Sequence, residues 1–165
     1  MEKRIKYCLA PTERQKDLLD RTFDYCLLVY NEGIKFREEQ HAAGKPAGLT
    51  QTGKMLTRLK RKPVLQFLTD VDSQALMGAL YRLDGEYQKF FNHTARHPEI
   101  KTQDEYGKYY VTHNTVGQLR VENGFLRLPK VGLVKTIQAL ENMPINRALI
   151  SKDESGQYYA SVDYE

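Results

Sequence analysis

The sequence predicts an α+β protein in which a small, OB-like β-barrel is interrupted after its first strand by three helices. Three observations lead to this prediction. The segment "RIKYCLA" alternates apolar and polar residues, which is typical of a half-buried strand. Apolar residues then recur at steps of three and four as far as Phe90, as they do in amphipathic helices. After Pro98 the chain consists of short β-rich segments, and only these segments can pair with the first strand.

The first helix is expected to follow the first strand directly. Pro11 ends the strand, and Thr12 with Gln15 has the spacing of a capping box. The helix should run to about His41, where "AAGKPAG" breaks it. Its buried stripe is predicted from six residues at helical spacing, namely Leu19, Phe23, Cys26, Leu27, Tyr30 and Ile34.

Two further helices are expected before Pro98, after which the helical spacing of apolar residues gives way to β-rich segments. The second covers about residues 50–62 and is stopped by Pro63, and the third covers about residues 72–96 and is closed by Pro98. The second helix is apolar at Met55, Leu56 and Leu59. The third buries Leu76, Leu80, Leu83, Tyr87 and Phe90 at steps of four and three.

The remaining chain is expected to form five or six short strands. Gly, Pro and Asn turns separate the segments "GKYYVTHN", "GQLRVE", "FLRLP", "VGLVKTIQ", "NRALISKD" and "QYYASVDYE". We therefore predict that residues 1–10 and 105–165 form the barrel, and that residues 11–104 form a helical lobe inserted into it.

Composition indicates a globular protein with a mild preference for anionic partners. The 165 residues are 41% hydrophobic and 28% charged, with a formal net charge of +4. No apolar run approaches the roughly 18 residues that cross a bilayer, and no signal-like region follows the first charges, so we expect a cytoplasmic protein. Cys8 and Cys26 lie among apolar neighbours in different elements, and we expect no disulfide between them.

Basic residues are concentrated on the second predicted helix. The segment "KMLTRLKRK" contains five cations and no acid, and we predict phosphate contacts from Lys54, Arg58, Arg61 and Lys62. A solvated helix face is the alternative. On the third helix Arg82, Lys89 and Arg96 recur every seven residues, but Glu86 lies within ion-pairing distance of the first two along the helix. This second stripe is therefore the weaker candidate.

The segment "GQLRVENGFLRLPK" predicts a hairpin with two arginines facing each other. A two-residue turn at Asn123-Gly124 places Arg120 opposite Arg127, and Glu122, diagonal to Arg127, offsets only part of their repulsion. We expect a phosphate to lie across both guanidinium groups, with Lys130 nearby. The alternative is an ordinary solvated face of a β-ribbon.

Other chemical motifs are weak. Tyr109, Tyr110, Tyr158 and Tyr159 lie near cations and could stack bases, although alternation along a strand should send about half of them into the core. His93 and His97 have the spacing of two zinc ligands on a helix, but no acid follows His93 and no third ligand is evident. We therefore expect neither a metal, nor a cofactor, nor a catalytic site, and the chain alone is typical of a binding protein.

Three segments resemble the amino-terminal half of the OrfB/TnpB proteins of bacterial insertion sequences. They are "APTERQKDLLDRTFDYCLLVYNEGIKFREE", "LTDVDSQALMGALYRLDGEYQKFF", and "NGFLRLPKVGLVK" together with "SGQYYASVDYE". The resemblance covers nearly the whole chain, and the string Val71-Asp72-Ser73-Gln74-Ala75-Leu76 together with Leu128-Pro129-Lys130 is specific. Members of this family, long called transposases, are RNA-guided DNA endonucleases. The resemblance implies a wedge domain, which is a β-barrel, interrupted by a helical recognition lobe.

The resemblance also implies partners and site residues. Guide RNA and duplex DNA would be bound between lobe and wedge, largely through their backbones. By position, the residues that read a short DNA motif would be Gln51, Met55, Ser73, Gln74, Met77, Asn114 and Thr115. The family's RuvC-like nuclease domain would follow a strand like "YYASVDYE", where this chain stops, so we expect no cleavage by these residues. The chain would be either an excised part or a truncated gene product.

Two other functions are compatible with the sequence. A stand-alone repressor derived from such a transposase would bind a short operator without RNA. A protein-interaction module would instead use the basic helix to bind an acidic protein. Binding to RNA, to duplex DNA or to neither distinguishes the three functions.

Overall fold

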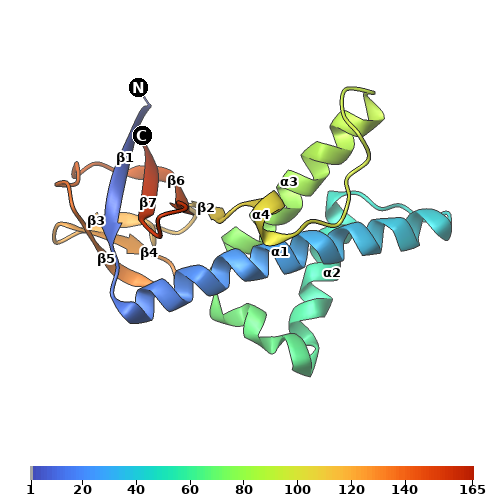
Figure 1. Ribbon diagram of the computed structural model, residues 1–165, viewed down its shortest axis with the longest axis horizontal. Coiled ribbons are helices and arrows are strands. Elements are labelled where there is room, and N and C mark those ends of the chain that lie inside the picture. Colours follow the sequence, from blue (N-terminus) through green and yellow to red (C-terminus); the bar gives the residue numbers. More distant parts are fainter. Residues whose placement is uncertain (1) are drawn as a thin grey trace. The chain divides into compact units, whose positions relative to one another are not determined.

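The computed structural model describes residues 2–165, which form one mixed sheet-and-helix chain (Figure 1). The helical elements are α1 (Glu13–Ala42), α2 (Leu49–Arg61), the 3-10 helix η1 (Pro63–Asp70), α3 (Ser73–Phe91) and α4 (Gln103–Tyr106). The strands are β1 (Lys3–Ala10), β2 (Tyr109–His113), β3 (Arg120–Glu122), β4 (Phe125–Leu128), β5 (Gly132–Thr136), β6 (Ile145–Lys152) and β7 (Tyr158–Tyr164).

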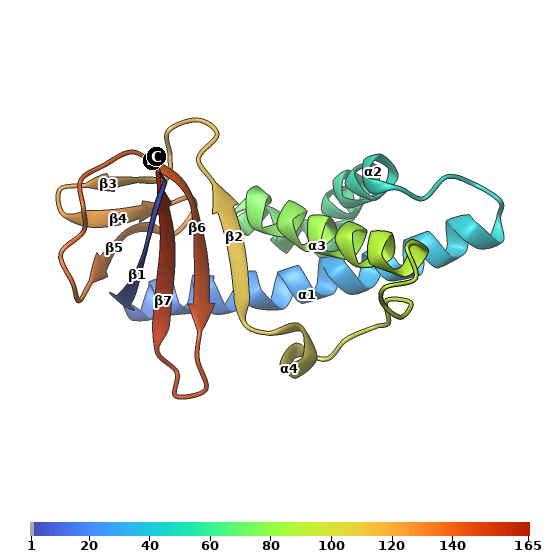
Figure 2. The same ribbon diagram turned by 90° about the horizontal axis from the view of Figure 1, so that it is seen from above.

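The chain divides into two compact units. The sheet unit contains the residues up to Phe23 together with Lys108–Glu165, and the helical unit is Asp24–Gly107. Within residues 2–165 all strands are antiparallel and form one sheet in the order β2-β6-β7-β1-β5-β4-β3, visible from above in Figure 2. The strand at the start of the sequence lies in the middle of the sheet and pairs with β5 and β7, so the prediction that its partners lie beyond Pro98 is confirmed.

The sheet is open, so the prediction of a closed barrel is wrong. The edges of the sheet are β2 and β3, and no ladder joins them among the described residues. Closure would require β3 to pair on both sides, but this strand has three residues and pairs with β4 alone. Strand β1 joins two parts of the sheet. It pairs with β7 from Lys3 to Cys8 and with β5 at Leu9 and Ala10.

The start of α1 belongs to the sheet unit, which extends along this helix as far as Phe23. The Gln15 side chain donates to the carbonyl of Leu133 on β5 at 2.8 Å. Further along the helix, the Phe23 ring packs 5.9 Å from the ring of Tyr110 on β2. The predicted capping box is confirmed, because Gln15 and Thr12 exchange side-chain hydrogen bonds with each other's backbone N–H at 3.0 and 3.2 Å.

The helical unit is built on close packing of α1 against α3. Gly33 of α1 faces Leu83 and Leu80 of α3, and a Cβ atom at this glycine would lie 2.7 Å from the Leu83 Cδ2 atom. Both leucines are fully buried. The core of the unit also contains Cys26, Val29, Tyr30, Ile34, Leu56, Leu68 and Leu76.

The third helix ends at Phe91, five residues before the predicted end at Arg96. It is closed by its own C-terminal turn, in which His93 has a left-handed φ of 60° and the Thr94 N–H donates to the carbonyl of Lys89 at 2.9 Å. Pro98 therefore does not end the helix. The short helices η1 and α4 were not predicted, and every helix in residues 2–165 is too short or too polar to cross a bilayer.

Candidate nucleic-acid interface

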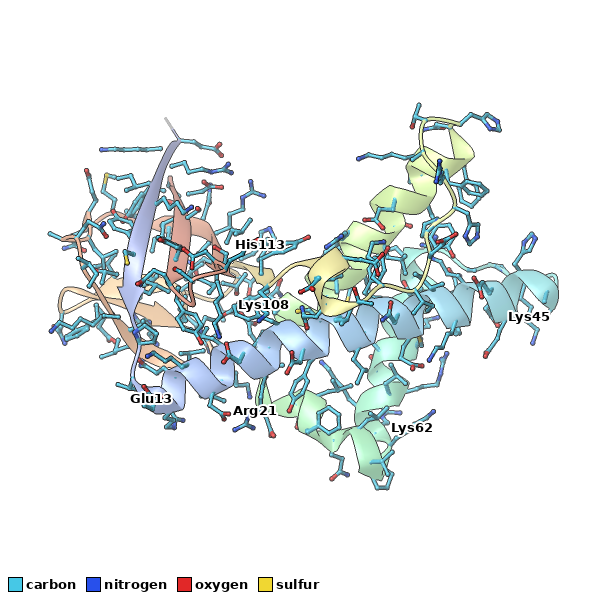
Figure 3. All side chains as sticks on the ribbon, in the orientation of Figure 1. Glu13, Arg21, Lys45, Lys62, Lys108 and His113 are labelled. Carbon is cyan, nitrogen blue, oxygen red and sulfur yellow. The ribbon has the colours of Figure 1, made fainter. Side chains whose placement is uncertain are left out.

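The predicted basic face of α2 is present in the structure. We use this name for Lys54, Arg58, Arg61 and Lys62, whose side chains are all exposed. Met55, Leu56 and Leu59 are buried on the other side of the helix, as the apolar spacing predicted. Within the described part of the chain, no salt bridge joins the four cations to an acid. Lys62 follows the last turn of α2 (Figure 3).

One edge of the basic face borders a groove of mixed charge. Arg58 and Lys62 line this groove of about 280 Å³ together with Glu32 and Glu39 of α1. The Arg58 guanidinium lies 5.7 Å from the ring centroid of Phe36, so its position is partly fixed by an aromatic contact. Lys54 and Arg61 do not line the groove, and their charge is directed at solvent.

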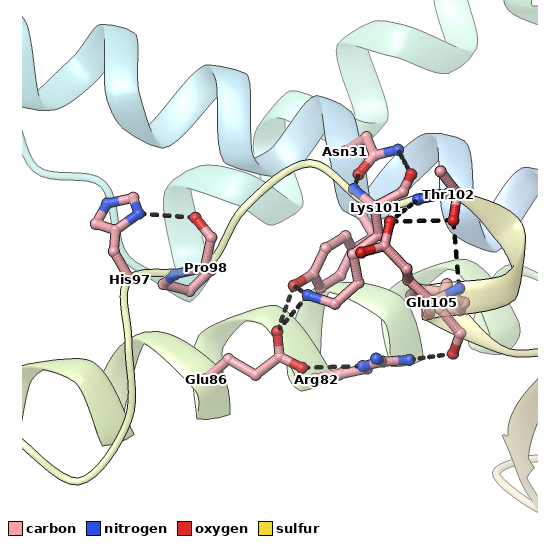
Figure 4. A network of polar contacts seen from close by, with 10 residues as sticks. Asn31, Arg82, Glu86, His97, Pro98, Lys101, Thr102 and Glu105 are labelled. Carbon is pink, nitrogen blue, oxygen red and sulfur yellow. Dashed lines mark hydrogen bonds and ion pairs between the residues drawn. The ribbon is translucent and has the colours of Figure 1, made fainter.

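Arg82 is held inside the helical unit, which corrects its assignment to a phosphate-binding stripe. Its Nε donates to Glu86 at 3.0 Å and its Nη1 donates to the carbonyl of Tyr106 at 2.8 Å. The guanidinium also lies 4.2 Å from the Tyr106 ring centroid. Arg82 therefore joins α3 to α4 (Figure 4). Lys89 is exposed near the end of α3, but Arg96 lies beyond the helix, so the seven-residue stripe does not form.

Glu86 is the centre of the polar network drawn in Figure 4. It accepts hydrogen bonds from Tyr30 and Arg82, and Lys101 approaches the same carboxylate at 3.3 Å. Burial by itself would raise the pKa of Glu86, but the two hydrogen bonds and the charge of Lys101 outweigh it and lower the pKa. Asn31 fixes the backbone of Lys101 by two hydrogen bonds of 2.9 and 3.0 Å. The network therefore ties the segment before α4 to α1 and α3.

The predicted hairpin register is confirmed. Arg120 pairs with Arg127, and Glu122 pairs with Phe125. Asn123 and Gly124 have φ values of 52° and 81°, as a two-residue turn of the hairpin type requires. Leu119, Leu126 and Leu128 are buried on the opposite face of the hairpin.

Glu122 lies between the two arginines. It accepts from Arg120 at 3.1 Å and from Arg127 at 3.5 Å, and Arg120 also donates to the carbonyl of Gly117 at 2.6 Å. The hydrogen bond from Arg120 is the main cause of a lowered pKa at Glu122. Repulsion between the arginines is therefore offset within the hairpin, and a phosphate there would share the guanidinium groups with Glu122. Lys130 is exposed beyond this hairpin.

Three of the residues proposed to read a DNA motif lie along the start of α3. Ser73 is exposed, whereas Gln74 and Met77 are half-buried. The Met77 methyl lies 3.9 Å from the position that a Cβ atom on Gly53 would take, so this side of α3 faces α2. The N-cap of α3 is Asp72, which accepts from the Gln74 N–H at 2.9 Å.

The other proposed readers are less accessible or lie elsewhere. Met55 is 5% exposed, and the structure corrects its assignment because a buried side chain offers no surface to a base. Gln51 accepts the Gly48 N–H at 2.9 Å as part of the cap of α2. Asn114 belongs to the sheet unit, where its amide donates to the carbonyl of Ile145 at 3.1 Å, and the neighbouring Thr115 is exposed.

Strand alternation divides the tyrosines as expected. Tyr110 and Tyr158 are buried, while Tyr109 and Tyr159 are half-buried. The Lys6 Nζ atom lies 4.6 Å from the ring centroid of Tyr159, so this ring already makes a cation–π contact within the chain.

His93 and His97 follow the end of α3, so the helical spacing on which a zinc pair depends is absent. The His97 Nδ1 atom lies 2.7 Å from the carbonyl oxygen of Pro98. Across residues 2–165, no group of three or more His, Cys, Asp and Glu side chains is placed to hold a metal ion.

Sequence reasoning missed an aromatic cleft in the helical unit. It is lined by Arg37 of α1 and by Asp84, Tyr87, Phe90 and Phe91 of α3. One signal was available: Arg37 comes three residues after the buried Ile34, which places a charged residue on the apolar stripe of α1. The remaining lining residues come from segments whose approach no local pattern predicts.

Comparisons with known proteins agree with the resemblance seen in the sequence. Residues 1–46 match a family model described as a helix-turn-helix domain and named for OrfB of IS605. A protein of Streptomyces pristinaespiralis, named as an RNA-guided DNA endonuclease, is 26% identical over 98% of this chain and 41% of its own length. Escherichia coli (strain K12) InsQ, named likewise, is 26% identical over 98% of this chain and 40% of its own length. The chain thus spans about two fifths of these relatives.

The description of the family model differs from the geometry. Between residues 2 and 46 the structure contains β1 and one uninterrupted 30-residue helix, α1. A helix-turn-helix reader needs two helices joined by a tight turn. The capping box at Thr12 and the continuous apolar stripe to Ile34 instead stabilise a single helix.

Proposed function

We propose that this chain, which corresponds to the amino-terminal part of OrfB/TnpB-type RNA-guided DNA endonucleases, binds guide RNA and a short motif in the adjoining DNA duplex. The activity named for the relatives belongs to proteins of which the chain spans about two fifths. We assign binding to the described residues and cleavage to none of them.

The basic face of α2 carries this proposal. Four exposed cations lie within nine residues, Lys54 to Lys62, and the buried side of α2 fixes the helix that bears them. Phosphate contacts of this kind displace condensed counterions and give affinity without sequence preference. Glu32 and Glu39 lie beside Arg58 and Lys62, so we expect Lys54 and Arg61 to contribute the larger share.

A second contact to the nucleic-acid backbone is proposed at the hairpin in the sheet unit. Arg120, Arg127 and Lys130 are the cations, and Glu122 weakens their combined field without removing it. Base reading is proposed at Ser73, Gln74 and Met77, because the amide of Gln74 matches the donor and acceptor of an adenine edge and Met77 can contact a thymine methyl.

The test is the salt dependence of RNA affinity. Fluorescence anisotropy with labelled single-stranded RNA, between about 50 and 200 mM salt, would compare the wild type with a variant carrying Gln at Lys54, Arg58, Arg61 and Lys62. Each lost contact should flatten the slope of log K against log salt by about 0.7, or about 3 for all four.

The matched control removes the same charge elsewhere, through Gln at Lys3, Arg14, Lys16 and Lys135. A general effect of net charge would change both variants equally, whereas the proposal predicts a much smaller slope change in the control. An unchanged slope in the α2 variant would refute the proposal.

The family model's description favours one alternative, a DNA-binding repressor that uses no RNA. Such a protein would bind duplex DNA in the presence of excess RNA and would show no RNA affinity of its own. The same anisotropy assay with competing RNA separates this alternative from the proposal. Binding to neither nucleic acid would instead favour the protein-interaction module.

A further inference from the structure

The aromatic cleft of the helical unit has the composition of a small-ligand site. Its volume is about 640 Å³, and it lies between the last turns of α1, the chain that follows them, and the last turns of α3. Phe90, Phe91, Tyr87 and His97 line it together with the Arg37–Asp84 ion pair. None of these residues takes part in the proposed backbone and motif contacts.

Two buried polar atoms at the wall of this cleft lack a partner within the described chain. Arg37 is 5% exposed, and its Nε atom makes no hydrogen bond although its Nη2 donates to Asp84 at 2.6 Å. Tyr87 is 4% exposed, and its hydroxyl is also without a partner. Buried donors left unsatisfied are costly, so these two atoms favour a ligand that offers hydrogen-bond acceptors.

The rest of the wall is aromatic. The His97 ring lies edge-on to Tyr87 at 5.3 Å and to Phe90 at 5.0 Å between centroids. Phe91 lies 6.0 Å from Tyr87 and remains 60% exposed, so one ring face is available for stacking. The Arg37 guanidinium lies 4.4 Å from the Tyr87 ring centroid, a cation–π contact that holds it against this wall.

We propose that this cleft binds one unstacked nucleobase of a bound RNA, with the base against Phe91 and its polar edge toward Arg37 and Tyr87. A planar base supplies both a face for the aromatic wall and acceptors for the two unpartnered groups. An apolar side chain of a protein partner would leave both groups unsatisfied. A free phosphate would approach the carboxylate of Asp84, which lines the same wall.

Lys45, a cation that lines the cleft, suits the backbone of the same nucleotide, although Glu38 also lines it. His41 lines the cleft as well, and Lys45 lies in the loop after α1 (Figure 3). Both are exposed. The identification of RNA as the source of the base rests on the proposed function. The affinity of the cleft for a base does not depend on it.

The first experiment compares RNAs with and without bases. Phe91→Ala should lower the affinity for a uridine or adenosine decamer by about tenfold, the effect of losing one stacking contact of about 1.4 kcal/mol. Affinity for an abasic ribose-phosphate decamer should not change. Tyr81→Ala is the control, since Tyr81 is a 53% exposed aromatic residue on the same helix but outside the cleft.

Tyr87→Phe separates a ligand role from a structural one. Removing the unpartnered hydroxyl should leave the free protein equally stable or more stable to heat, because a buried polar group is lost. Its affinity for the base-containing decamers should nevertheless fall severalfold. A variant that melts lower and binds as before would show that the hydroxyl serves the fold.

A second measurement is independent of RNA affinity. Ligand-observed NMR with nucleoside 5′-monophosphates should show saturation transfer to the base protons, which Phe91→Ala abolishes, and ribose 5-phosphate should show none. Failure of the wild type to bind long RNA while monophosphates still bind would refute the proposed function and keep the base site. Equal losses in the Phe91 and Tyr81 variants, or transfer unaffected by Phe91→Ala, would overturn the base site alone.

Discussion

Because α1 and α3 approach closely at Gly33, we expect Gly33→Ala and Gly85→Ala to differ in their effect on the free energy of unfolding. Alanine is better than glycine by about 0.8–1 kcal/mol in the interior of a helix. At Gly33 the new methyl would lie 2.7 Å from Leu83 Cδ2 and 3.1 Å from Leu80 Cδ2. These leucines are 0% and 1% exposed, so they cannot move aside into solvent. Overpacking of this kind costs about 1–3 kcal/mol, so Gly33→Ala should be neutral or destabilising by up to about 2 kcal/mol.

Gly85→Ala is the matched control on α3. Gly85 is exposed, and no atom lies within 4 Å of the position its Cβ atom would take. The helix-propensity gain of about 1 kcal/mol should therefore appear undiminished, which raises Tm by about 2–4 °C for a chain of this size.

Thermal and urea unfolding of both single variants and the wild type would measure the difference. We expect Gly85→Ala to exceed Gly33→Ala by about 1–3 kcal/mol in free energy of unfolding. Equal stabilisation by the two substitutions would mean that α1 and α3 do not pack at Gly33 in solution. The packing of the helical unit, and with it the aromatic cleft, would then need revision.

Three further predictions concern the charged and polar sites. Arg127→Gln should leave the Tm of the free chain nearly unchanged, because it removes both an ion pair with Glu122 and the repulsion with Arg120. The same substitution should lower the affinity for RNA. A lower Tm with unchanged RNA binding would show that the arginines serve the fold. The hydrogen bond from Arg4 is the main cause that lowers the pKa of Asp163 from 3.8 to about 2, so this carboxylate stabilises the fold above about pH 4 and loses that effect as the pH falls through 2. Asp163→Asn should accordingly reduce Tm at pH 7 and flatten its decline between pH 4 and 2, and parallel Tm curves would contradict this. Gln74→Ala should cost about 1–3 kcal/mol of discrimination at one base pair of a selected duplex, measured by competition binding, and an equal loss on all sequences would make Gln74 a positioning contact.

Local sequence determined the parts of the fold that depend on neighbours along the chain. The capping box at Thr12, the apolar steps of α1 and the Asn123-Gly124 turn each depend on residues within one or two turns of each other. The hairpin register follows from that turn alone, which explains why the pairing of Arg120 with Arg127 was predicted correctly. The basic face of α2 was predictable for the same reason, since its cations and its buried residues share one short helix.

Only the tertiary structure decided where α3 ends, whether the sheet closes and what each charged residue contacts. Arg82 donates a hydrogen bond to the carbonyl of Tyr106, which is 24 residues away in the sequence. No spacing pattern in the sequence predicts a contact between residues so far apart. The two edge strands have no ladder between them, although a list of strands is equally compatible with a barrel. The aromatic cleft likewise depends on the last turn of α3 reaching the end of α1. Such contacts depend on the packing of distant segments, and the sequence by itself determined only the residues available to make them.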